Sequence, residues 1–228
     1  MNSKDVIARM QKAIDVDADG LWGPASTQAL ENWEQFNGVD FFTRENLPPP
    51  PTQPAMIFNP DYLWGQADPR WGTDLLGTKP MRTVGCGIAA SAIACSIVTK
   101  QRIDPGSLNE WLRNNNGYTG DTMNIVKWSS IAEYVNSFWN IKVKHAFGIS
   151  EYAAVNYLAD GIPVLCYVDY ADDLDDNPDH FVCLLAYNDD DGYTFADPAT
   201  TPASIETFVT SKRHGGYTPQ RFDAFVPA

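Results

Sequence analysis

The stretch RTVGCGIAASAIACSIV, residues 82–98, decides the fold of the larger part of this chain. Its small residues and its isoleucines predict a buried helix that packs closely against its neighbours. Cys86 would stand at the start of that helix, where backbone N–H groups and the helix dipole stabilise a thiolate. Gly85 and Gly87 on either side would let a substrate backbone approach the sulfur. Cys95 lies about half a rotation further around the helix, so we expect it in the core.

Three later runs read as strands: GIPVLCYVDY (161–170), HFVCLLAY (180–187) and GYTFADPA (192–199). The link NDDDG between the last two has the length of an ordinary hairpin connection. Folding this hairpin brings the start of one strand beside the end of the next. The pattern therefore predicts that His180 and Asp197 lie together at one open end of the sheet.

The other histidines and cysteines give weaker signals. His145 and His214 have basic neighbours and no carboxylate partner that the sequence reveals. Cys166 and Cys183 lie within apolar runs and are predicted to be core thiols. No C-x-x-C pair is present, and the cysteine spacings match no small disulfide scaffold. We therefore expect no zinc site, no disulfide framework and no cofactor.

A nucleophilic thiolate needs a base, a group that orients the base, and a donor for the tetrahedral oxyanion. Cys86, His180 and Asp197 supply the nucleophile, the base and the orienting group in that chain order. Gln66, in WGQADPRWG, precedes Cys86 by twenty residues and supplies a candidate side-chain donor.

The run GQADPRWGTDLLGT…GCGIAASAIA…HFVCLLAY…ADPA resembles the papain-like cysteine peptidases related to the bacteriocin-leader, or double-glycine, peptidases. The resemblance covers essentially residues 60–200. It implies an α+β domain in which the helix that bears the nucleophile packs on an antiparallel sheet. It also implies Cys86 as nucleophile, His180 as base, Asp197 as the orienting group and Gln66 as oxyanion donor. GIAA follows the cysteine, where a proline–threonine pair is common in the family.

The clearest boundary in the chain is LPPPPTQP, residues 47–54, whose five prolines favour a stiff spacer. We therefore predict three parts: an all-α domain over residues 1–46, a proline-rich linker over 47–56, and the peptidase domain over 57–228. DVIARMQKAI and GPASTQALENWEQFNG within the first part have the periodicity of two short helices.

Between these helices, DVDADG (15–20) matches the opening of an EF-hand calcium loop. The twelfth position of such a loop should be a glutamate and here it is Ser26, so calcium is not expected. The same region resembles the small helical peptidoglycan-binding module and implies that fold and ligand. The resemblance is carried by Asp19, Gly20, Trp22, Gly23, Pro24, Thr27, Ala29, Leu30 and Phe36.

Net charge excludes some partners. At pH 7 the chain carries a formal charge of -13, which disfavours nucleic acid and anionic lipid surfaces. No run is long and apolar enough to span a bilayer, and no secretory signal is visible at the N-terminus. The segment 169–191 holds nine aspartates. It reads as a solvated loop, as a rim that selects a cationic group, or as a calcium site, and its charge should raise the pKa of His180.

Together these features predict an endolysin-like cysteine peptidase that cuts an amide in the peptide part of peptidoglycan. We expect a monomer that is made in the host cytoplasm without a signal peptide and acts at the bacterial cell wall. Three alternatives stay open. The domain could process a leader peptide or a protein, it could be an amidase or transpeptidase with the same triad, or it could be an inactive wall-binding or virion protein.

Overall fold

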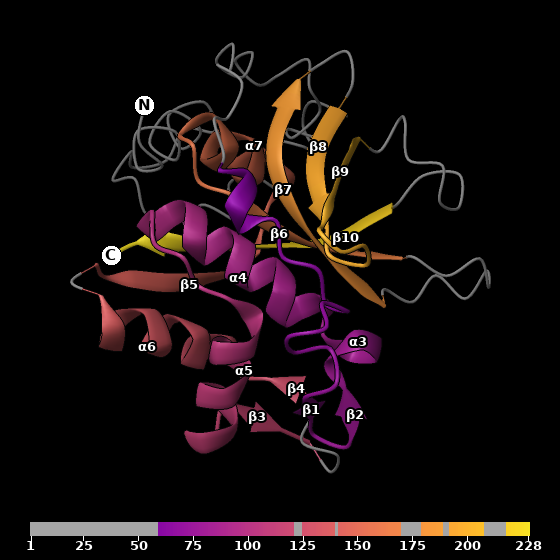
Figure 1. Ribbon diagram of the computed structural model, residues 1–228. Helices are drawn as coiled ribbons and strands as arrows, with labels where there is room; N and C mark the ends of the chain where they lie inside the picture. Colours follow the sequence, from indigo (N-terminus) through magenta and orange to yellow (C-terminus); the bar gives the residue numbers. More distant parts are fainter. Residues whose placement is uncertain (1–58, 121–124, 140, 170–178, 189–191, 208–217) are drawn as a thin grey trace. The chain divides into compact units, whose positions relative to one another are not determined.

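The computed structural model describes residues 59–120, 125–139, 141–169, 179–188, 192–207 and 218–228 (Figure 1). The predicted helical domain over residues 1–46 and the predicted linker lie outside the described residues. The same holds for His214 and for much of the aspartate-rich segment. The described ranges therefore all belong to the predicted peptidase domain.

Helices and strands alternate irregularly along this domain. The helices are η1 (Pro60–Tyr62), α3 (Met81–Val84), α4 (Cys86–Thr99), α5 (Pro105–Asn114), α6 (Trp128–Phe138) and α7 (Glu151–Ala159). The strands are β1 (Leu75–Leu76), β2 (Lys79–Pro80), β3 (Tyr118–Thr119), β4 (Ile125–Val126), β5 (Val143–Ile149), β6 (Val164–Asp169), β7 (His180–Asn188), β8 (Gly192–Asp197), β9 (Ser204–Thr207) and β10 (Thr218–Pro227).

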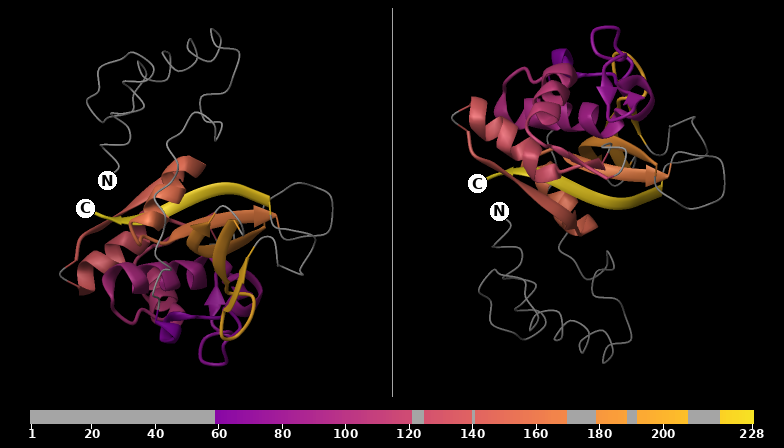
Figure 2. Two further views of the ribbon diagram at one scale, coloured as in Figure 1. Left: turned by 90° about the horizontal axis from the view of Figure 1, so that it is seen from above. Right: turned by 90° about the horizontal axis from the view of Figure 1, so that it is seen from below.

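Six strands form the main sheet in the order β5-β10-β6-β7-β8-β9, and every neighbouring pair is antiparallel. Helices cover both faces. Figure 2 shows α4 and the segments around it on one side of the sheet and α7 on the other. The mixed helical and antiparallel architecture agrees with the predicted α+β class.

Each face of the sheet has its own hydrophobic core, and the side chains of β7 alternate between the two. Cys183 and Leu185 pack in the core that contains α4, whereas Val182 and Leu184 pack in the core that contains α7. Successive strand residues point to opposite faces, so a strand covered on both sides is apolar throughout. This explains the continuous run VCLL in the sequence.

The predicted central helix is confirmed as α4. Most of its residues are buried, including its alanines, its serines and two of its three isoleucines, as expected of a helix that is covered on all sides. It begins at Cys86 after Gly85, and Lys100 ends it in the left-handed conformation with φ 56°. Cys86, the first residue of this buried helix, is partly exposed, whereas the other three cysteines are buried.

The three other cysteines are buried, which confirms the prediction that they are core residues. Cys95, Cys166 and Cys183 are at most 1% exposed, and burial raises the pKa of each of these thiols well above its ordinary value. All four cysteines are free. No helix in the described ranges combines the length and hydropathy needed to cross a bilayer.

Candidate active site

Cys86 is placed by a tight junction between two helices. Gly85 ends α3, donating its N–H to the Met81 carbonyl at 2.7 Å, and accepts the Ala89 N–H of α4 at 2.9 Å. A Cβ on Gly85 would lie 2.5 Å from the Met81 oxygen. The glycine before the cysteine is therefore required by packing within the protein. The sequence had suggested instead that it leaves room for a substrate.

His180 and Asp197 lie together, as the hairpin pattern predicted. The pairing of β7 with β8 sets Cys183 opposite Ala196, and the His180 Nε2 is 2.8 Å from the Asp197 Oδ1. Asp197 is fully buried, and its Oδ1 also accepts the Ala199 N–H at 2.8 Å. Two contacts thus fix the carboxylate that orients the imidazole.

The Cys86 thiol lines the same cavity as this imidazole and is close enough to raise its pKa. With Asp197 at Nε2, a proton exchanged with the sulfur would pass through Nδ1. Burial of the ring lowers the pKa of His180, but the hydrogen bonds to Asp197 and Cys86 and the charges of both partners outweigh it and raise the pKa to about 9. The direction of this shift agrees with the sequence prediction, although its causes among the described residues are these two partners.

Hydrogen bonds hold Gln66 between the loop after Asp197 and the helix before Cys86. Its backbone N–H donates to the Pro198 carbonyl at 2.8 Å, next to Asp197, and its Nε2 donates to the Arg82 carbonyl at 3.0 Å, in the helix before Cys86. A Cβ on Gly65 would lie 2.2 Å from the Thr200 oxygen, so only glycine permits this close approach of the two loops. One N–H of the Gln66 amide remains for another acceptor.

A cavity of about 550 Å³ joins three of the four predicted site residues, and Asp197 stands behind His180 as its partner. Its walls combine apolar side chains with polar ones, among them an acidic residue and two basic residues. It is lined by Gln66, Leu76, Thr83, Val84, Cys86, Gly87, Ile88, Ile125, Val126, Trp128, Tyr167, Asp179, His180, Phe181, Ala199 and Arg221. A cavity of this size holds a peptide segment of a few residues.

The prediction that His145 lacks a carboxylate partner is wrong. Its Nε2 lies 3.8 Å from the Asp223 Oδ2, within ion-pair range although too long for a hydrogen bond. Its ring stacks on Trp128, with centroids 5.7 Å apart. The carboxylate is 78 residues away in sequence, and only the pairing of β5 with β10, which sets His145 opposite Phe225, brings it near.

Sequence reasoning also missed Arg221, which lines the cavity, and Asp223, to which Arg221 is bonded. Both lie on the last strand, in a stretch that reads TPQRFDAFVP. The alternation of charged and apolar residues there indicates a strand. Only the fold reveals that this strand lies between β5 and β6 and borders the cavity.

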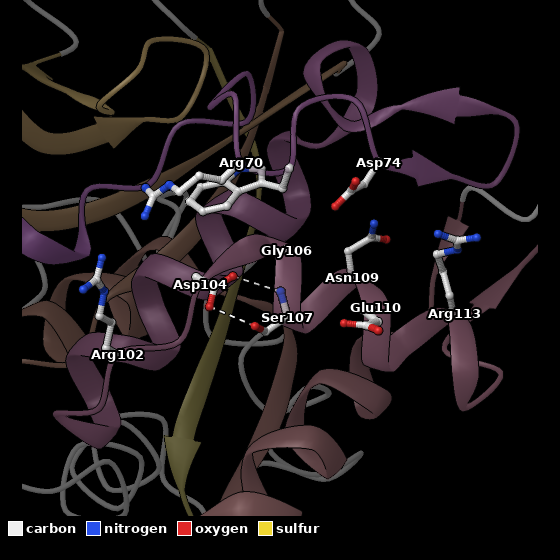
Figure 3. Close-up of a pocket in the computed structure, with 10 residues that line it drawn as sticks. Arg70, Asp74, Arg102, Asp104, Gly106, Ser107, Asn109, Glu110 and Arg113 are labelled. Atoms are coloured by element: carbon white, nitrogen blue, oxygen red, sulfur yellow. Dashed lines mark hydrogen bonds between the residues drawn. The ribbon is translucent and has the colours of Figure 1, made fainter.

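A second cavity, of about 570 Å³, contains none of the predicted site residues (Figure 3). Arg70 and Arg102 lie on one side of it and Arg113 on the other, with acidic residues between them. Asp104 caps α5 there by accepting hydrogen bonds from the N–H and the hydroxyl of Ser107 at 2.9 Å.

Within the described ranges, no group of three or more His, Cys, Asp or Glu side chains could hold a metal ion. The calcium-loop match at residues 15–20 lies outside those ranges. The first cavity presents a thiol, an imidazole and an amide, with a carboxylate behind the imidazole, and these groups suit acyl transfer through a covalent intermediate.

Comparison with known proteins identifies one family. The model of the Peptidase_C39 like family matches residues 68–215. The match covers more than half of the chain and includes Cys86, His180 and Asp197, whereas Gln66 lies two residues before it. No curated protein matches the chain. The chain belongs to the Peptidase_C39 like family, and its described domain is a papain-like cysteine peptidase domain.

Proposed function

We propose that this protein hydrolyses an amide bond in the peptide stem or cross-bridge of peptidoglycan, with Cys86 as nucleophile, His180 as base and acid, Asp197 as orienting group and Gln66 as oxyanion donor. The observation that carries the proposal is that the Cys86 thiol and the His180 ring line one cavity, with the ring hydrogen-bonded to the buried Asp197 carboxylate. This cavity is of peptide size.

The reaction follows from this arrangement in two steps. The Cys86 sulfur adds to the amide carbonyl, and the Cys86 N–H and the Gln66 amide donate hydrogen bonds to the oxyanion. The C–N bond then breaks as His180 gives its proton to the leaving amine, which leaves a thioester. His180 next takes a proton from water, the water oxygen adds to the thioester carbon, and the C–S bond breaks to release the acid.

The raised pKa of His180 suits this sequence. Because hydrogen bonds to Asp197 and Cys86 hold the pKa near 9, the imidazole is protonated at neutral pH and is ready to donate to the leaving amine. The start of α4 beside it stabilises the negative charge on sulfur.

The wall substrate rests on the resemblance of residues 1–46 to peptidoglycan-binding modules. A weakly binding module on a stiff linker raises the local concentration of the catalytic domain at its substrate, and it needs no contact with that domain. In this proposal the protein is endolysin-like and reaches the wall from the host cytoplasm. The rival with the best support is processing of a leader peptide or a protein, because the same site would cut any peptide that fits the cavity.

The experiment is to expose purified peptidoglycan sacculi to the wild type, to Cys86→Ala and to the matched variant Cys95→Ala, in which a buried thiol of the same helix is removed. Released fragments are identified by mass spectrometry. We expect new peptide termini with the wild type and Cys95→Ala and none with Cys86→Ala. Intact sacculi with the wild type, together with cleavage of unrelated proteins or leader peptides, would replace the wall substrate by peptide processing.

A further inference from the structure

Arg221 brings a positive charge into the active-site cavity. It lines the cavity together with Cys86, Trp128 and Phe181, and it comes from β10, which pairs with β6 on one side and β5 on the other. The register of the β10–β6 pairing shifts between Pro219 and Arg221. Such irregularities re-aim side chains and are common beside functional sites.

The guanidinium is held in place from behind by a buried carboxylate. Its Nε and Nη2 atoms both lie 3.0 Å from the Asp223 Oδ2. Asp223 is 1% exposed, and its Oδ1 accepts the Gly148 N–H at 2.8 Å. Burial raises the pKa of Asp223, but His145, the Gly148 N–H and Arg221 together hold it below its usual range. An ionised carboxylate thus fixes the direction of the arginine.

This anchoring leaves most of the donors of the guanidinium available. Arginine carries five N–H donors, and two of them serve Asp223. In the part of the chain that the structure describes, no other acceptor bonds to Arg221, and 27% of its side chain is exposed. Three N–H groups therefore remain for a ligand in the cavity.

Aromatic rings surround the charge and limit its contact with water. The guanidinium carbon lies 4.8 Å from the ring centre of Phe147, 5.2 Å from Tyr167 and 5.5 Å from Phe181. Cation–π contacts hold the group in place. Electrostatic attraction to an incoming anion is stronger in such a setting than in open water.

Arg221 and the nucleophile Cys86 line the same cavity. Tyr167, which stacks on Phe181 with centroids 4.3 Å apart, is affected by both groups. Burial raises the pKa of Tyr167, the Cys86 charge raises it further, and Arg221 lowers it. A substrate held at Cys86 would therefore be close enough for a neighbouring residue to meet Arg221.

We propose that Arg221 is a specificity-determining residue whose guanidinium binds a carboxylate of the substrate beside the amide that Cys86 attacks, with Asp223 as its positioning residue. The proposal rests on the proposed peptidase function. The planar fork of arginine matches a carboxylate in geometry. Asp179 lines the same cavity and would repel a second negative charge, so the favoured ligand is a single carboxylate next to neutral or cationic groups.

The first test uses a synthetic peptide that spans the bond which the enzyme cuts in sacculi. The peptide is made with each of its carboxylates replaced in turn by a carboxamide. One replacement should lower kcat/KM of the wild type about tenfold or more, as expected for the loss of charged hydrogen bonds. In Arg221→Gln, kcat/KM for the carboxylate peptide should fall to the level of that carboxamide peptide. The kcat/KM for the carboxamide peptide should stay within about twofold of its wild-type value. Arg221→Lys should retain part of the preference.

The matched control is Arg70→Gln, which removes an arginine from the second cavity (Figure 3). It should keep the carboxylate preference of the wild type. Thermal unfolding of Arg221→Gln and Arg221→Lys separates loss of binding from loss of folding. If Arg221→Gln lowers turnover of the carboxylate and carboxamide peptides equally, Arg221 has only a structural role and the proposal is overturned.

The second test does not depend on peptide cleavage. Iodoacetate, which is charged, and iodoacetamide, which is neutral, both alkylate a thiolate by forming a C–S bond and releasing iodide. The other three thiols are at most 1% exposed, so the rates report Cys86. Arg221→Gln should lower the iodoacetate rate several-fold relative to the iodoacetamide rate. An unchanged ratio of the two rates would overturn the proposal.

The two tests separate failure of this proposal from failure of the proposed function. If the wild type cuts no peptide but the ratio of alkylation rates falls in Arg221→Gln, the peptidase proposal fails and the anion site stands. If peptides are cut and neither the ratio nor the carboxylate preference changes in Arg221→Gln, the peptidase proposal stands and the anion site is overturned.

Discussion

At the scale of the residue, the chemistry of the site depends on how His180 is held. The ring is buried, which by itself would favour the neutral form. The hydrogen bonds to Asp197 and Cys86 reverse this preference and bring the pKa to about 9. Asp197 is itself held by the Ala199 N–H, so the acid that protonates the leaving amine depends on one buried carboxylate.

The first prediction at this scale is the pH profile of kcat/KM. Activity should fall as the pH rises through about 9, where His180 loses its proton. Asp197→Asn removes the charge but keeps an oxygen for Ala199, so its basic limb should move to lower pH by about one unit or more. An unchanged basic limb in this variant would contradict the assigned role of Asp197.

The same shift fixes the sign of the effect of pH on stability. The pKa of His180 in the folded protein lies above the unfolded value of about 6.5. Protonated His180 therefore stabilises the folded state fully below pH of about 6.5, and this contribution is lost as the pH rises towards 9. Urea unfolding of the wild type and of His180→Gln at pH 6 and pH 9 measures this contribution to stability.

At the scale of the element, α4 carries both the core and the nucleophile. It is buried along most of its length, and its first residue, which lines the cavity, is separated from the end of α3 only by Gly85. Any displacement of the α3–α4 junction moves the sulfur relative to His180. Since a displacement of about 1 Å can cost a hundredfold in rate, the junction matters for activity as well as for stability.

Two alanine substitutions beside Cys86 should therefore behave differently. Gly85→Ala would place a Cβ 2.5 Å from the Met81 oxygen and should lower the free energy of unfolding by about 1–3 kcal/mol, with a loss of kcat. Gly87→Ala would meet only Phe181 and Trp128, at 3.5 Å, and should leave the stability within about 1 kcal/mol. Urea unfolding compares the two, and equal stability would show that the junction tolerates a side chain.

The elements also show what local sequence patterns can and cannot reveal. The hairpin of β7 and β8 joins His180 to Asp197 across only 17 residues, so spacing alone predicted their contact. The start of a helix at Cys86 could also be predicted from a local pattern, the run of small residues that follows it. The group of His145, Arg221 and Asp223 depends on β10 lying between β5 and β6, and no local pattern indicates that strand order.

At the scale of the whole molecule, the site is assembled from parts of the chain that are far apart. Gln66 comes from the loop before β1, Cys86 from α4, His180 and Asp197 from the central hairpin, and Arg221 from the last strand. The close approach of Gly65 to Thr200 brings the loop that contains Gln66 against the segment that follows the hairpin. The sheet and its two cores thus act as the rigid frame on which acyl transfer depends.

The role of Cys86 as the nucleophile is tested most directly on the folded wild-type protein. The enzyme is alkylated to increasing extents with iodoacetamide, and hydrolysis of a synthetic peptide that spans the bond cut in sacculi is measured beside the modified fraction of each cysteine by mass spectrometry. Because the other three thiols are buried, activity should fall in direct proportion to modification of Cys86 and reach zero when it is complete. Hydrolysis that persists in protein fully alkylated at Cys86 would contradict the account.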